Sequence, residues 1–203
     1  MTELVKPGAA GSPRAVPSKQ MELKVQRNAT FEDWESVPEG ESAQLIDGVL
    51  YITSRPNIHH ATAVTYLIQS LTPFSRDRAK GWVLLFEPAL RFGSDFVVGD
   101  IAGWRRERLP TIPRGAKWID TAPDFICEAL SPSTAKIDRG RKRELYAKAK
   151  VSHVWFIDPL NCTLEVLALA KGIYQVVASA GGDDRGRFPP FDVELDLAML
   201  WEP

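Results

Sequence analysis

The chain has 203 residues, of which 44% are hydrophobic and 25% are charged, and these values are typical of one globular domain with a hydrophobic core. Its net charge of −1 argues against a protein that coats nucleic acid indiscriminately, because such binding needs many basic residues to neutralise phosphates. No apolar run approaches the roughly 18 residues of a membrane span, and two cysteines cannot build a disulfide framework. We therefore expect a cytoplasmic protein that does not cross a membrane.

The first part of the chain differs in composition from the rest. Residues 1–27 are rich in Pro, Gly, Ala, Ser and Lys without apolar periodicity, which predicts a disordered N-terminal tail. Residues 28–203 are predicted to form a single domain. Thr30 and Asp33 match an N-cap with its acidic partner three residues later, and they predict a short helix that ends near Ser36.

Two β-rich runs and a long helix follow. Residues 43–46 and 49–52 flank Asp47-Gly48, and an Asp-Gly pair between such runs is a strong signal for a β-hairpin. Residues 58–78 carry apolar side chains at helical spacing along one stripe, which predicts a helix. Pro73 is expected to end or kink that helix, since proline lacks the backbone N–H.

The rest of the chain alternates strands and helices. A helix is expected at residues 135–150, after a break with capping residues, and a short closing helix at 196–201. Strands are predicted at residues 82–87, 89–92, 96–102, 124–130, 153–157, 163–169 and 173–178. This alternation predicts an α/β domain.

Two acidic residues lie inside predicted strands. Glu128 is in the apolar run 124–130, where an ionised carboxylate is costly unless it is paired or bound to a metal. Asp100 has a comparable position in the run 96–102. Two carboxylates at neighbouring strand ends can bind a hard cation such as Mg²⁺, which prefers oxygen ligands. A single acid in a strand more often faces solvent, so this alternative stays open for either residue.

Lys142 favours the metal-site interpretation. At about 100° per residue, it shares one helix face with side chains that should pack on the sheet. That face consists of Asp138, Lys142, Leu145, Tyr146 and Ala149. The buried ammonium needs an anion, and one account is an ion pair with Asp138, four residues earlier. The account we favour directs it at Asp100 and Glu128, where it would stabilise transition-state charge.

Several other residues have both a functional and a structural interpretation. His60, near the start of the long helix, could act on a phosphate or a water, because helix N-termini favour anions. A hydrogen-bonded core or cap histidine is the more common alternative. Tyr146 and Trp155 are expected to pack rather than to stack on bases. Two basic clusters, at 136–150 and 105–108, fit either nucleic-acid contacts or solvated polar faces.

Five segments occur in an order and spacing that resemble a known family. They are 44–48, His60 with Leu67, Asp100, 122–134, and Asp138 through Lys142 and Tyr146 to 155–159. Together they resemble the Uma-two family of restriction-endonuclease-like proteins, within the PD-(D/E)XK nuclease superfamily. The resemblance covers about residues 30–180, and its specific part is 123–159.

The resemblance implies a restriction-endonuclease-like core with a mixed β-sheet flanked by helices, and Mg²⁺-dependent hydrolysis of DNA phosphodiester bonds, with Mn²⁺ as an alternative cation. Asp100 and Glu128 match the two acids of the superfamily motif, and the backbone carbonyl of Ala129 would join them as a metal ligand. The motif lysine normally lies two residues after the second acid, where this chain has Leu130. Lys142, on the following helix, resembles a migrated replacement.

Departures from the family pattern leave a second function open. Gly99 stands where the motif usually has proline, and Gln44 stands where the family usually has glutamate. If that glutamate assists metal or water binding, its replacement by Gln44 weakens activity. A nuclease-fold binding or regulatory protein with weak or no catalysis is therefore the alternative to a DNA endonuclease. DNA is the expected partner, and a homodimer stays open. For the endonuclease, we expect the Asp100 and Glu128 carboxylates to lie within about 5 Å of each other, and the Lys142 ammonium within about 6 Å of one of them.

Overall fold

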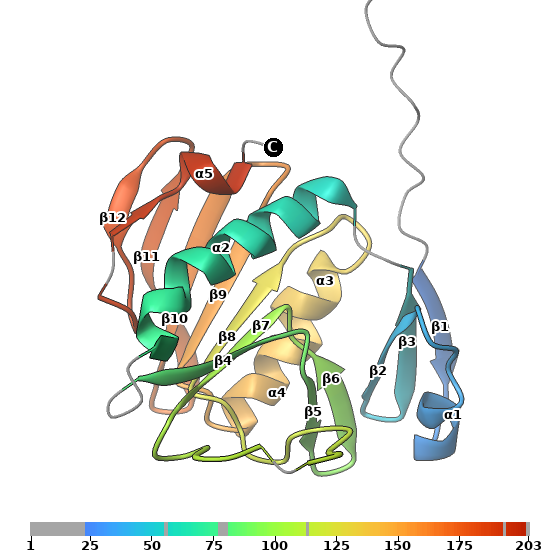
Figure 1. Ribbon diagram of the computed structural model, residues 1–203. Helices are drawn as coiled ribbons and strands as arrows, with labels where there is room; N and C mark the ends of the chain where they lie inside the picture. The colour runs from blue at the N-terminus through green and yellow to red at the C-terminus, as the bar shows by residue number, and fades with distance from the viewer. Residues whose placement is uncertain (1–22, 55–56, 77–80, 113, 193, 202–203) are drawn as a thin grey trace, which may run out of the picture.

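The computed structural model describes residues 23–54, 57–76, 81–112, 114–192 and 194–201. Helices pack on both faces of a six-stranded sheet, and a second, five-stranded sheet lies beside this unit (Figure 1). The predicted α+β architecture, in which helices flank β-structure, is therefore confirmed. The β-structure is divided into several sheets.

The six-stranded sheet forms the centre of the molecule. Its strands, in spatial order, are β11 (Ile173–Gly181), β10 (Thr163–Ala170), β9 (His153–Asp158), β8 (Phe125–Ala129), β7 (Ile101–Arg105) and β4 (Trp82–Phe86). β8 and β9 are parallel, and the other neighbours are antiparallel, so the sheet is mixed as predicted. A helical crossover joins the parallel pair, because parallel neighbours cannot be joined by a tight turn.

The five-stranded sheet contains the predicted hairpin. Its strands, in spatial order, are β1 (Leu23–Arg27), β3 (Val49–Thr53), β2 (Ser42–Ile46), β6 (Asp95–Val98) and β5 (Ala89–Phe92). The β2–β3 turn is at Asp47-Gly48, whose φ angles are 50° and 69°. Positive φ at both turn residues matches the twist of the strands, which is why Asp-Gly predicts this turn.

The helices are α1 (Phe31–Glu35), α2 (Ile58–Arg76), α3 (Ala135–Ile137), the π-helical η1 (Asp138–Lys142), α4 (Arg143–Lys148) and α5 (Ala198–Trp201). Thr30 and Asp33 form the predicted capping box of α1. α2 continues past Pro73 to Arg76, so the proline does not end it. Within the described ranges, no helix is long and apolar enough to cross a membrane.

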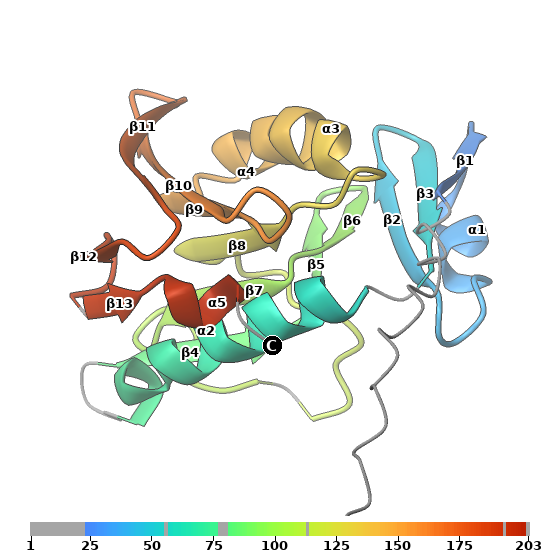
Figure 2. The same ribbon diagram turned by 90° about the horizontal axis from the view of Figure 1, so that it is seen from above.

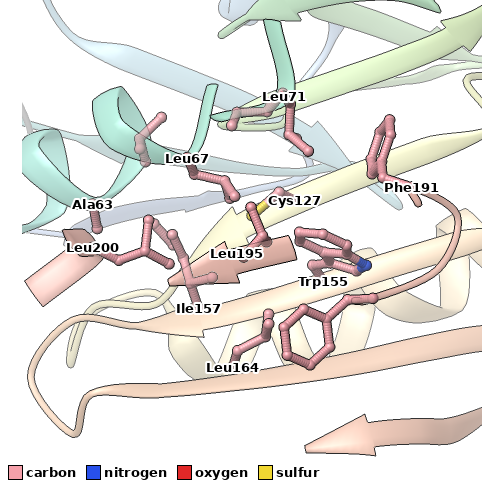
Figure 3. Close-up of a cluster of buried hydrophobic side chains, with 14 of the residues drawn as sticks. Ala63, Leu67, Leu71, Cys127, Trp155, Ile157, Leu164, Phe191, Leu195 and Leu200 are labelled. Carbon is pink, nitrogen blue, oxygen red and sulfur yellow. The ribbon is translucent and has the colours of Figure 1, made fainter. Parts of the chain in front are cut away.

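Alternation of side chains along β8 and β9 divides the core into two layers. α2 and α4 lie on opposite faces of the six-stranded sheet (Figure 2). Cys127 and Trp155 pack with α2, whereas Ile126 and Phe156 pack with α4. Figure 3 shows the layer under α2, where Leu67 points toward Cys127. Successive residues of a strand point to opposite faces, so strands that are covered on both sides need continuous apolar runs.

Leu67→Ala is expected to lower the free energy of unfolding by about 2–5 kcal/mol, because the Leu67 side chain is fully buried and its loss leaves a cavity. Gln69→Ala, at an exposed position of the same helix, is the control and should change stability by less than about 0.5 kcal/mol. Urea unfolding followed by circular dichroism measures both. Equal effects of the two variants would contradict the packing of α2.

Three predicted boundaries are wrong. Residues 1–22 of the predicted tail lie outside the described residues, but Leu23–Arg27 form β1 and pair with β3. The run 96–102 is not one strand, because it divides at Gly99 between β6 and β7, which belong to different sheets.

The third error concerns the end of the chain. The helix predicted at 196–201 begins only at Ala198, after a small hairpin of β12 (Arg185–Arg187) and β13 (Glu194–Asp196) that local patterning does not indicate. β1 is held by backbone pairing with β3, which lies beyond α1 and β2 in the chain, whereas β12 and β13 pair with each other. Composition and local periodicity carry little information on such pairing.

Candidate active site

Asp100 and Glu128 lie on neighbouring strands of the six-stranded sheet. Asp100 directly precedes β7, and Glu128 lies near the end of β8. The antiparallel register pairs Ile101 with Cys127, so the two acids come next to each other along paired strands. Both line one cavity of about 800 Å³. The acids found in separate strand runs of the sequence thus belong to one site.

Both oxygens of Asp100 have partners. Oδ1 lies 2.8 Å from Nε2 of His60, and Oδ2 accepts a hydrogen bond of 2.7 Å from the backbone N–H of Ala129. Burial lowers the pKa of His60, but the hydrogen bond and charge of Asp100, together with the charges of Glu87 and Asp138, outweigh burial and raise this pKa. His60 therefore holds the Asp100 carboxylate at the wall of the cavity.

Glu128 is 2% exposed, and two side chains of the described residues contact its carboxylate. Nζ of Lys142 lies 2.7 Å from Oε2, and the hydroxyl of Tyr146 donates a hydrogen bond to Oε1. Burial raises the pKa of Glu128 to about 8, although the charge of Lys142 lowers it. The ionised form of this carboxylate therefore depends on a cation beside it.

The side chain of Lys142 is 2% exposed and has two further acceptors. Nζ lies 3.2 Å from Oδ1 of Asp138 and donates to the backbone oxygen of Val98 at 3.0 Å. Burial lowers the pKa of Lys142, but the charges of Glu128, Asp138 and Asp100 outweigh burial and raise it above its ordinary value. The predicted contact of the ammonium with a carboxylate is confirmed, and the alternative pair with Asp138 is present as well.

The helix after β8 presents this cluster through a π-helical turn. Asp138, Lys142, Leu145 and Tyr146 are buried, as the predicted helix face requires. The segment Asp138–Lys142 is π-helical, and single π-turns are frequent at functional sites. Tyr146 does more than pack, because it also hydrogen-bonds to Glu128. Its position on the same face as Lys142 is the sequence signal that could have identified this contact.

Gln44 of β2 contributes to the same cavity from the other sheet. Its side chain lines the cavity beside those of Asp100 and Glu128, and the residue is 8% exposed. Oε1 of Gln44 is buried and has no hydrogen-bond partner within the described part of the chain. An unpaired buried acceptor is costly, so this oxygen is a candidate ligand atom.

Comparisons with known proteins identify the family and the fold of the chain. Residues 29–199 match the Uma2 family, whose description is "Putative restriction endonuclease". The chain belongs to the Uma2 family. Its structure is similar to the crystal structure of "a putative nuclease belonging to DUF820" from Anabaena variabilis, with a TM-score of 0.69 and 21% identity over 85% of this chain and 97% of the other. At this identity the likeness shows the fold alone. A comparison with curated proteins gives no significant match.

The structure explains two positions at which this Uma2 protein departs from the pattern that the resemblance implies. A Cβ atom at Gly99 would lie 3.2 Å from Cγ2 of Ile126 and 3.8 Å from Oε1 of Glu128, so glycine lets the backbone pass close to the site. Leu130 is 5% exposed and belongs to the hydrophobic layer under α4. A lysine at that position would enter the core, whereas the ammonium of Lys142 lies 2.7 Å from Oε2 of Glu128.

The donor atoms of the cavity fit a small divalent cation. Asp100, Glu128 and Gln44 line it with side-chain oxygens, which Mg²⁺ and Mn²⁺ prefer. Each oxygen of the Asp100 carboxylate has one hydrogen-bond partner and keeps a further acceptor position. Among the described residues, no group of three or more His, Cys, Asp or Glu side chains could hold a metal ion. Amide, water and substrate oxygens would therefore complete the coordination, as is usual for Mg²⁺. The Ala129 carbonyl stays a prediction.

Several basic residues of the two clusters form ion pairs at the surface. These pairs are Arg139–Glu165, Arg141–Asp47 and Arg108–Asp124. Surface pairs contribute only about 0–1 kcal/mol, so phosphate groups can compete for such side chains. A role of the clusters in nucleic-acid binding stays a prediction.

Proposed function

We propose that this Uma2 protein is a divalent-metal-dependent endonuclease that hydrolyses DNA phosphodiester bonds. One observation carries the proposal: the buried ammonium of Lys142 contacts Glu128 at the wall of a cavity that Asp100 and Gln44 also line. Moving an ammonium and a carboxylate from water into the protein interior costs desolvation free energy, so a buried ion pair is weak evidence that the pair stabilises the fold. This cost favours a functional reason for the pair. Membership in the family supports the same reaction class.

In this proposal, Asp100 and Glu128 hold Mg²⁺ or Mn²⁺, with Gln44 and the Ala129 carbonyl as further oxygen ligands. When bound, the cation supplies a Lewis acid for a phosphoryl oxygen and lowers the pKa of its bound water. Lys142 stabilises the negative charge that develops on the phosphoryl oxygens.

Two further residues keep the acids in place. His60 holds Asp100 through Oδ1, and Tyr146 holds Glu128 through Oε1. Each contact fixes the orientation of one carboxylate at the cavity. Neither residue needs to contact substrate for this role.

The test is nicking of supercoiled plasmid DNA by purified protein. We expect nicked and then linear plasmid with Mg²⁺ or Mn²⁺, and no conversion with EDTA, because the carboxylates alone cannot neutralise charge on the phosphoryl group. Agarose electrophoresis measures the initial rate. A preparation of Glu128→Ala made in parallel controls for contaminating nucleases. Metal binding without cleavage would instead favour the nuclease-fold binding or regulatory protein.

A further inference from the structure

Lys142 uses all of its hydrogen-bond donors within the protein. An ammonium has three N–H groups. In this structure Nζ contacts three acceptors: Oε2 of Glu128 at 2.7 Å, Oδ1 of Asp138 at 3.2 Å and the oxygen of Val98 at 3.0 Å. A phosphate in the cavity could therefore receive an N–H of Lys142 only after one of these contacts opens.

The contact with Glu128 is the one that a metal ion would open. The Tyr146 hydroxyl occupies Oε1 of Glu128, and Lys142 occupies Oε2. A divalent cation at Oε2 would lie against the ammonium, and like charges repel strongly in a buried site. Lys142 and the cation therefore compete for the same oxygen atom.

Asp138 is placed to receive the ammonium after this exchange. Its side chain is 5% exposed, it contacts Nζ, and it lines the same cavity as Glu128. We propose that Asp138 is a positioning residue, which keeps Lys142 in the cavity when a divalent cation replaces Lys142 at Glu128. This inference rests on the proposed function. Lys142 then retains Asp138 and Val98, and its third N–H becomes free for a phosphate oxygen.

The same arrangement explains why a second carboxylate is buried beside Lys142. Without Asp138, Glu128 would be the one anion among the described contacts of Nζ. The ammonium would then hold Glu128 more firmly, and the cation would have to displace it without an alternative anion nearby. Asp138 thus lowers the cost of freeing Glu128.

Mn²⁺ binding at pH 8.5 tests this exchange directly, with free Mn²⁺ measured by electron paramagnetic resonance. The proteins are the wild type, Lys142→Met, Asp138→Asn and the double variant, each checked for folding by circular dichroism. Arg141→Met is the matched control, because Arg141 is exposed and pairs with Asp47 at the surface. Plasmid nicking is measured in parallel.

Lys142→Met is expected to bind Mn²⁺ about 10-fold more tightly than the wild type, because the competing ammonium is gone, while nicking is lost. Asp138→Asn is expected to bind Mn²⁺ about 10-fold more weakly. In the Lys142→Met background, Asp138→Asn should change the affinity by less than about 2-fold, since Asp138 acts through Lys142. Arg141→Met should bind as the wild type does.

Two results would overturn the inference. Weaker Mn²⁺ binding by Lys142→Met would show that Lys142 does not compete with the cation. If Asp138→Asn lowers the Mn²⁺ affinity equally in the wild type and in the Lys142→Met protein, Asp138 acts by its charge alone and not through Lys142. If the wild type binds Mn²⁺ and nicks DNA while either result holds, the inference fails and the proposed function stands. If neither the wild type nor Lys142→Met binds Mn²⁺, the inference and the proposed function both fail.

Discussion

Lys142→Ala is expected to lower the free energy of unfolding by about 3–5 kcal/mol at pH 8.5, because it leaves the carboxylates of Glu128 and Asp138 buried without their shared cation. Both carboxylates have side chains no more than 5% exposed, so water cannot replace the ammonium. Urea unfolding measures the change. Lys148→Ala, at an exposed position of α4, is the control and should change stability by less than about 0.5 kcal/mol.

The loss caused by Lys142→Ala should be smaller at pH 5 than at pH 8.5. Burial already raises the pKa of Glu128 from 4.5 to about 8 with the ammonium present, and it raises the pKa of Asp138. When a pKa is higher in the folded protein than in the unfolded chain, the folded protein holds a proton that the unfolded chain releases. The free energy of unfolding therefore falls as the pH rises from 5 to 8.5. If Lys142→Ala lowers the free energy of unfolding equally at pH 5 and pH 8.5, unpaired carboxylates are not the cause of the decrease.

Glu128→Gln is expected to lower the initial rate of metal-dependent plasmid nicking by at least ~100-fold. The change keeps the shape of the side chain and its acceptor for Tyr146, but it removes the charge that would hold the cation. Loss of groups that only support a metal ligand already costs about 10–100-fold in activity or metal affinity, so loss of the ligand's charge should cost at least as much.

The measurement for Glu128→Gln is the nicking rate over a range of Mn²⁺ concentrations. Glu165→Gln is the matched control, because Glu165 is a partly exposed carboxylate that pairs with Arg139. It should nick at the wild-type rate. Unchanged nicking by Glu128→Gln at every Mn²⁺ concentration would remove Glu128 from the proposed site and would place the cleavage chemistry elsewhere.

Local features of the sequence were sufficient for much of the fold and for the centre of the candidate site. The Asp47-Gly48 turn and the Thr30 cap follow from backbone preferences of a few adjacent residues, and both are present as predicted. Glu128 and Lys142 stood out because each is a charged residue at a position where apolar neighbours require burial. A charged residue among apolar neighbours can be recognised within one strand or one helix face. In the structure, the two charges pair with each other at 2.7 Å.

Only the tertiary structure decided which groups meet at the site. His60 lies 40 residues before Asp100 in the chain, and Gln44 belongs to a different sheet, yet both line one cavity with the two acids. Periodicity shows that a side chain is buried, but not which partner it meets, because the partner depends on strand pairing and on how the two sheets pack. The division of the run 96–102 between two sheets has the same cause. For Lys142, the helix face predicts an inward-pointing ammonium, but it does not predict the acceptor at Val98, which belongs to β6 and lies 44 residues earlier in the chain.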